Sequence, residues 1–330
     1  MSRPVLLLLG AIALALPLSL LAGRVWIDPF HPVLAAAPAI LFELRLPRGV
    51  LALVVGAGLG GAGAAMQGYL RNPLADPGLF GIAPGAALGA VLALLAGASA
   101  AWVLPLAAFI GAAAAMALLA LIAGRTAGVA LFTLAGMMIA SLAGALTSLA
   151  ISLAPNPFAL SEIVTWLMGA LTDRGWAEVW IAAPPTLLGL VVLVRAGRDL
   201  DALTLGEEAA RSLGVEPRRV QALMIAGVGL TVGAVVAVAG IIGFVGLMVP
   251  HLIRPFTDRQ PSQLIVPSAL GGALLVLVAD MLCRILPLAG GELRLGIALS
   301  LLGAPFFLAL LLRMRRGLGL GFRVPTFQRV

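Results

Sequence analysis

The sequence contains no lysine, so all 21 of its basic residues are arginine. A Walker A loop needs a lysine beside the nucleotide phosphates, and Schiff-base chemistry needs a lysine amine. Both kinds of site are therefore excluded for this chain. If the protein uses ATP, a separate chain must bind the nucleotide.

Charge and cysteine are also scarce. Charged residues make up 11% of the chain and hydrophobic residues 62%, whereas about a quarter of a soluble domain is charged. A single cysteine, Cys283, excludes an internal disulfide and a thiolate metal cluster. No paired carboxylates, nucleophile–base pair or metal-ligand cluster can be recognised. We therefore expect an all-α polytopic membrane protein that has no catalytic site, metal site or cofactor of its own.

Long hydrophobic runs recur along the chain, most of them close to the ~20 residues that a helix needs to cross a bilayer. They predict one transmembrane domain over residues 1–330, with a retained first helix rather than a cleaved signal. Residues 155–177 are expected to form a short interfacial helix with Trp166 and Trp176 at headgroup depth. The ten predicted spans are 4–22, 48–70, 79–98, 101–123, 129–153, 178–195, 220–240, 241–254, 263–284 and 295–313.

The distribution of arginine predicts the orientation. With ten spans both termini lie on one side, and that side carries fifteen of the 21 arginines. Because cytoplasmic loops are rich in basic residues, both termini are expected in the cytoplasm. This topology accounts for the net charge of +7 without nucleic acid as a partner. The six arginines on the other side are Arg24, Arg45, Arg48, Arg174, Arg284 and Arg294.

One long polar segment, residues 195–219, interrupts the hydrophobic sequence. Thr204 and Glu207 have capping-box spacing, and Gly214 is a natural residue to follow a helix, so a short helix is expected over 206–214. Such a helix is too short to be stable alone. It either rests on its own membrane domain or docks onto a cytoplasmic partner, with Ala209, Ala210 and Leu213 as its apolar face.

Several motifs, in order and at appropriate spacing, give the chain a family resemblance. From about residue 40 to 316 it resembles the permease family of type II ABC importers for iron–siderophore complexes, haem and vitamin B12. The motifs are Arg45-Leu46-Pro47-Arg48, Gln67, Asn72 to Gly81, Gly243 to Leu247 with Pro250-His251, Ala279-Asp280 with Arg284, and Leu302 to Phe307.

The resemblance implies a permease subunit of the inner membrane that works with two ATP-binding cassette ATPases and a periplasmic binding protein. A second permease copy, identical or related, would complete the transporter. ATP hydrolysis would take place on the separate ATPase subunits. The cargo would be a metal chelate, either iron–siderophore or haem, with vitamin B12 as the alternative.

The resemblance also implies roles for individual residues. Arg45, Arg48 and Arg284 match the outward arginines that pair with glutamates of the binding protein. An internal pair between Asp280 and Arg284, four residues apart, is the alternative for Arg284. Residues 196–219 match the cytoplasmic coupling segment. Its candidate ATPase contacts are Glu207, Glu208, Ala209, Ala210, Arg211, Leu213 and Gly214.

Two other functions stay open. An ion-coupled secondary transporter would need ionisable groups at mid-membrane, and Asp280 beside Arg284 is close to a span end. A lipid-modifying membrane enzyme would rest on Glu162 and Asp173 alone. For His251 we expect a hydrogen-bonded structural role rather than haem ligation or proton relay. Met137 and Met138 are expected to pack in the core rather than line a pathway, and nothing singles out His31.

Overall fold

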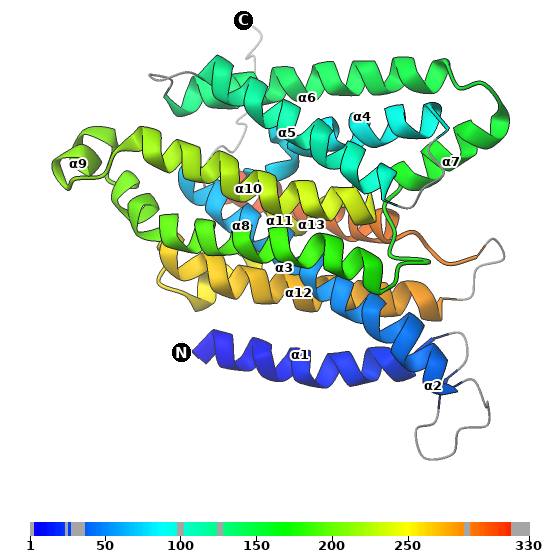
Figure 1. The fold of residues 1–330 in the computed structure, drawn as a ribbon. Coiled ribbons are helices and arrows are strands. Elements are labelled where there is room, and N and C mark those ends of the chain that lie inside the picture. The colour runs from blue at the N-terminus through cyan, green and yellow to red at the C-terminus, as the bar shows by residue number, and fades with distance from the viewer. Residues whose placement is uncertain are drawn as a thin grey trace, which may run out of the picture.

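The computed structural model describes residues 3–23, 26–27, 37–97, 102–123, 128–286 and 291–317. These residues form helices and no β-strand, which confirms the predicted all-α class. The helices run side by side in one bundle (Figure 1). They are α1 (Arg3–Leu21), α2 (Ala37–Ala39), the π-helix η1 (Ile40–Arg45), α3 (Leu46–Tyr69), the 3₁₀ helix η2 (Pro77–Phe80), α4 (Ile82–Leu95), α5 (Val103–Ala123), α6 (Val129–Ser152), α7 (Pro157–Leu167), α8 (Trp176–Leu203), α9 (Glu207–Ser212), α10 (Pro217–Ala239), α11 (Val245–Ile253), the 3₁₀ helix η3 (Arg254–Phe256), α12 (Pro261–Ile285) and α13 (Leu295–Gly317).

Each predicted span corresponds to a helix, but two of these helices are short. Within the described part of the chain, eight helices are long and apolar enough to cross a membrane. The other two predicted spans became α4, with 14 residues, and α11, with nine. The predicted interfacial helix is α7, where the Asn156 side chain accepts a hydrogen bond from the Ala159 N–H at 2.9 Å. Trp166 of α7 is buried, so it packs inside the protein rather than at the surface.

Helix α3 forms the centre of the bundle. It packs against α12, α8, α11 and α10, and most of its residues are buried. The approach to α12 is closest at Gly56 and Gly272, where a Cβ atom on either glycine would overlap the carbonyl of the other. Small residues at such a crossing let two helix backbones touch, which is how helices associate in lipid. The glycine-rich composition therefore serves the packing of α3.

The two ends of the bundle carry different features. Helix α9 and the start of α1 lie at one end, while η1 and the start of α3 lie at the other (Figure 1). The predicted polar loop is shorter than expected, because α8 continues as a helix through Leu203 and holds Arg195 and Arg198. Residues 204–216 therefore make the connection between α8 and α10.

Candidate functional sites

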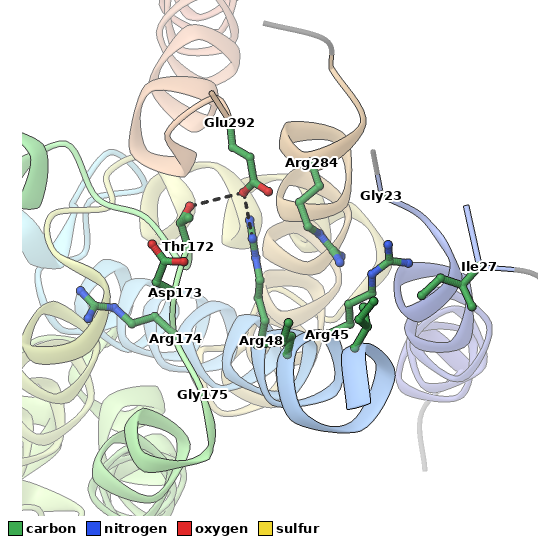
Figure 2. Close-up of a pocket in the computed structure, with 12 residues that line it drawn as sticks. Gly23, Ile27, Arg45, Arg48, Thr172, Asp173, Arg174, Gly175, Arg284 and Glu292 are labelled. Carbon is green, nitrogen blue, oxygen red and sulfur yellow. Dashed lines mark hydrogen bonds and ion pairs between the residues drawn. The ribbon is translucent and has the colours of Figure 1, made fainter. Parts of the chain in front are cut away.

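Helix ends bring the predicted docking arginines together at the end of the bundle opposite α9. Arg45 ends η1, Arg48 lies in the first turn of α3, and Arg284 lies in the last turn of α12. We call these arginines, with Asp280 and Glu292, the arginine cluster. The three arginines and Glu292 line a pocket of about 610 Å³ that Thr172, Asp173 and Arg174 also line (Figure 2). Three arginines predicted from two motifs far apart in the chain thus line one cavity.

Asp280 holds two of these arginines at once. One of its oxygens accepts from Arg48 Nε at 3.0 Å and Nη2 at 2.9 Å, and the other lies 3.2 Å from Arg284 Nε. The Asp280 side chain is 1% exposed, so each charge needs the others in this buried position. The expected Asp280–Arg284 pair is confirmed. Asp280 interacts more extensively with Arg48, a pairing that the sequence did not indicate.

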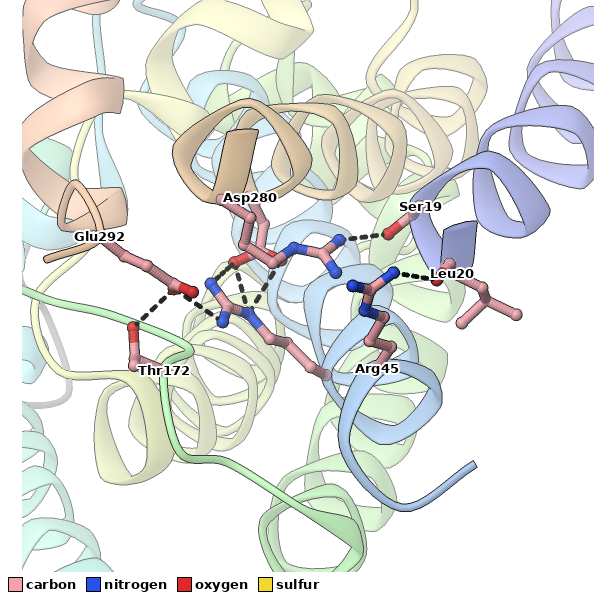
Figure 3. A network of polar contacts seen from close by, with 8 residues as sticks. Ser19, Leu20, Arg45, Thr172, Asp280 and Glu292 are labelled. Carbon is pink, nitrogen blue, oxygen red and sulfur yellow. Dashed lines mark hydrogen bonds and ion pairs between the residues drawn. The ribbon is translucent and has the colours of Figure 1, made fainter. Parts of the chain in front are cut away.

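Glu292 neutralises Arg48 from the other edge of the guanidinium. Its carboxylate lies 2.8 Å from Arg48 Nη1 and accepts a hydrogen bond of 3.4 Å from the Thr172 hydroxyl (Figure 3). Sequence reasoning missed Glu292 and Thr172 because they lie far from α3 in the chain. The sequence offered one signal for such a pairing, the scarcity of acidic residues: the chain has only 14, and each carboxylate needs a counter-ion or water.

The remaining donors of the cluster tie α1 to the bundle. Arg45 Nη1 donates to the carbonyls of Leu20 and Leu21, each at 2.8 Å, and so satisfies the end of α1. Arg284 Nη2 donates to the Ser19 hydroxyl at 2.6 Å (Figure 3). Arg284 Nη1 is buried and has no hydrogen-bond acceptor among the described residues. That unpartnered donor lies in a residue that lines the pocket.

The short helix expected in the polar segment is α9, but its start differs from the prediction. Thr204 ends α8 and its hydroxyl donates to the Asp201 carbonyl at 2.6 Å, so it does not cap α9. Gly206, with φ of 105°, stands at the N-terminus instead. The capping-box prediction was wrong because α8 extends further than its hydrophobic run.

The end of α9 follows the prediction. Gly214 has φ of 82°, in the left-handed region that favours glycine. Its N–H donates to the Arg211 carbonyl, and the Val215 N–H donates to the Ala210 carbonyl at 2.9 Å. These two bonds form a Schellman motif, which satisfies the last carbonyls of the helix.

The predicted apolar face of α9 is divided between two environments. Ala210 is fully buried against its own chain, and Ala209 is half-buried. Leu213 is 65% exposed, as is Leu205 just before the helix, at 68%. Ala210 therefore anchors α9, which supports the structural alternative for that residue. Leu213, Glu208 and Arg211 stay accessible to a partner.

The last turn of α3 is joined to α11 and η3 by polar contacts of Gln67. Gln67 donates from Nε2 to the Leu247 carbonyl at 3.2 Å, and its Oε1 accepts from Arg254 at 2.7 Å. Gln67 thus links α3 to α11 and η3.

Asp76 organises the turn that follows. Its carboxylate accepts a hydrogen bond from the Gly78 N–H at 2.7 Å and caps the 3₁₀ helix η2. Burial raises the pKa of Asp76, and the bond from Gly78 acts in the opposite direction. The Asn72-to-Gly81 motif is therefore a rigid turn at the α9 end of the bundle.

Other singled-out residues differ from expectation. Met137 and Met138 are 54% and 53% exposed on α6, so the expected core packing was wrong. His251 packs edge-on against Phe306, with ring centroids 5.9 Å apart, but its buried Nδ1 has no hydrogen-bond partner in the described part of the chain. Cys283 is buried. Arg24 and His31 lie outside the described ranges, as do Arg125 and the residues after 317.

Comparison with known proteins identifies the family. The model of the FecCD transport family matches residues 8–313. The chain belongs to the FecCD transport family. It is 40% identical over 285 residues to the ABC transporter permease YvrB of Bacillus subtilis, covering 84% of this chain and 80% of that protein. It is 38% identical over 313 residues to the vitamin B12 import system permease BtuC of Vibrio cholerae, covering 93% of each.

A solved structure supports the same assignment. A metal-chelate type ABC transporter in an inward-facing conformation superposes with a TM-score of 0.87 and 31% identity, covering 94% of this chain and 98% of that one. This FecCD-family chain is therefore a multi-pass transport permease, and the resemblance drawn from its motifs is confirmed.

Proposed function

We propose that this permease is the membrane subunit of a binding-protein-dependent ABC importer that carries a metal chelate, iron–siderophore or haem, across the inner membrane. The observation that carries the proposal is the placement of a basic pocket at one end of the bundle and the exposed helix α9 at the other. Vitamin B12 is the alternative cargo, since relatives named for its import share 37–38% identity with this chain.

The partners follow from the same arrangement. Because the chain has no lysine for a Walker A loop, ATP hydrolysis belongs to two separate ATPase subunits. Helix α9 contacts them, with Leu213 as the apolar contact and Glu207, Glu208 and Arg211 at its edge. A second permease, identical in the simplest case, completes the pathway. Arg45, Arg48 and Arg284 receive carboxylates of the binding protein.

The test is transport by the assembled complex. The permease is reconstituted with a candidate ATPase in vesicles, and candidate binding proteins from the same cells are added one at a time. Stimulated ATPase activity identifies the binding protein, and uptake of ferric siderophore, haem and cobalamin identifies the cargo. Arg45→Gln should weaken the stimulation and leave basal ATPase activity intact, while Arg294→Gln serves as the control on the same side. No stimulation by any binding protein, and no uptake, would refute the function.

The orientation belongs to the proposal as well. The fifteen arginines on the side of Arg3 support a cytoplasmic position for both termini and α9, and α9 shares its end of the bundle with the start of α1 (Figure 1). Single cysteines at the exposed positions Ala177 and Ser212, in a Cys283→Ala background, provide the test. An impermeant thiol reagent added outside should label the first and not the second. The reverse pattern would invert the topology.

A further inference from the structure

The two carboxylates that neutralise Arg48 are held very differently. Asp280 is 1% exposed and contacts two arginines. The Glu292 side chain is 24% exposed. Its contacts in the described part of the chain are Arg48 and the long hydrogen bond of 3.4 Å from Thr172. One carboxylate is thus buried in the core, and the other lines the pocket and is partly exposed.

The backbone segments that carry Asp280 and Glu292 also differ. Asp280 lies within α12 and is buried between Arg48 and Arg284, so there is no open space into which its side chain could rotate. Glu292 lies in the non-helical residues 291–294 before α13. A side chain on such a segment can leave the cluster by rotation without breaking a helix. Glu292 is therefore the carboxylate that can be exchanged.

The donors in the pocket fit a second carboxylate in its place. Arg48 uses Nε and Nη2 for Asp280 and Nη1 for Glu292 (Figure 3). Arg284 adds a buried Nη1 that has no acceptor among the described residues, and its guanidinium lines the same pocket (Figure 2). A carboxylate entering the pocket would meet Arg48 Nη1 once Glu292 leaves, and a shift of the buried Arg284 guanidinium would bring the second donor within reach.

We propose that Glu292 is an internal stand-in for the docking carboxylate: it occupies Arg48 while the binding protein is absent and is displaced when the protein docks. The inference rests on the proposed function of the arginine cluster. A buried arginine without a counter-ion is strongly unfavourable, so exchange keeps Arg48 paired in both states. Since one ion pair replaces another, docking gains little net affinity at Arg48 and stays reversible.

The main test compares two carboxylates of one pocket. Glu292→Gln and Asp173→Asn each remove one negative charge, and Asp173 makes no hydrogen bond or ion pair in the described part of the chain. Asp173 has φ of 59°, a conformation that asparagine also adopts readily. The probe is the binding protein that stimulates the wild-type transporter, measured as its Kd for the reconstituted complex.

Glu292→Gln should lower this Kd about two- to fivefold, the range of a partly exposed ion pair, whereas Asp173→Asn should change it less. Equal effects of both variants would mean that only the net charge of the pocket matters, and no effect of Glu292→Gln would mean that Glu292 does not compete. Either result overturns the proposal. Thermal unfolding of each variant checks that the fold is retained.

A second measurement needs no binding protein. Phenylglyoxal modifies accessible arginines, and peptide mass mapping reports the rate at Arg48. The rate should rise with Glu292→Gln and Glu292→Ala and stay at the wild-type value with Asp173→Asn. An unchanged rate would show that Glu292 does not cover Arg48 and would refute the exchange alone. A wild-type complex that no binding protein stimulates would instead refute the proposed function, and the exchange with it.

Discussion

The arginine cluster and α9 lie at opposite ends of the bundle, and their charged side chains differ in burial and in pairing. In the cluster, Arg48 and Arg284 are 12% and 5% exposed at their side chains, and Asp280 is shared between them. On α9, Glu207 and Arg211 form a single long pair of 3.9 Å, with side chains 37% and 64% exposed. A buried network fixes backbone positions because its charges cannot be left unpaired, whereas an exposed pair leaves a surface open to a partner.

The largest expected effect comes from removing the shared carboxylate. Asp280→Asn leaves Arg48 with Glu292 alone and removes the carboxylate that pairs with the buried Arg284, so we expect a loss of about 3–5 kcal/mol in the free energy of unfolding. Thermal unfolding of the purified permease in lipid nanodiscs measures the change. Asp173→Asn, in the same pocket but free of such contacts among the described residues, should unfold like the wild type. Equal stability of the two variants would show that the network does not hold this end together.

A smaller effect is expected where α1 joins the cluster. Ser19→Ala removes the acceptor of the 2.6 Å bond from Arg284 Nη2. A buried donor then loses its partner, which costs about 1–3 kcal/mol. Ser300→Ala is the control, since the Ser300 hydroxyl only donates within its own helix, to the Gly296 carbonyl at 2.7 Å. If both variants unfold alike, α1 does not depend on this contact.

At the other end, the effect should appear in partner binding and not in folding. Leu213→Asp puts a charge on an accessible apolar position, so the ATPase should bind at least about tenfold more weakly, or ~1.4 kcal/mol, while the unfolding temperature stays the same. Pull-down of the ATPase and vesicle uptake measure it. Leu153→Asp, equally exposed at 67% but after α6 at the far end, is the matched control. Normal ATPase binding by Leu213→Asp would move the contact to the turn over residues 71–81.

The fold could be predicted from the sequence because hydrophobic runs and arginine counts are local features. Element ends were harder to predict: α8 runs through Arg195 and Arg198 to Leu203, because Ala196, Leu200 and Leu203 keep one buried face at helical spacing between the charged residues. The polar sequence was therefore misread as a loop, and Thr204 was placed at the start of the next helix when it ends α8.

The cluster could be predicted only in part, for a physical reason. Arg45, Arg48 and Arg284 stand out as arginines on the side that should have few, and Asp280 stands four residues from Arg284. The pairing of Arg48 with Asp280 joins residues 232 positions apart, and no pattern in a single sequence reports such a distance. Glu292 and Ser19 were missed for the same reason.

The smallest effect is expected at the exposed charge pair of α9. Replacing Glu207 and Arg211 with glutamine, singly and together, forms a double-mutant cycle for their pair. An exposed pair four residues apart on a helix contributes about 0.3–0.5 kcal/mol at most, and a separation of 3.9 Å between the charged atoms places it at the weak end. The coupling energy for unfolding should therefore be close to zero.

ATPase association should respond more, because charges at the edge of an interface act mainly on the association rate and its salt dependence. The cycle is measured twice, by thermal unfolding and by ATPase binding at low and high salt. A coupling energy above about 1 kcal/mol in unfolding would exceed what exposed pairs provide. It would mean that charge pairing stabilises α9 as it stabilises the arginine cluster.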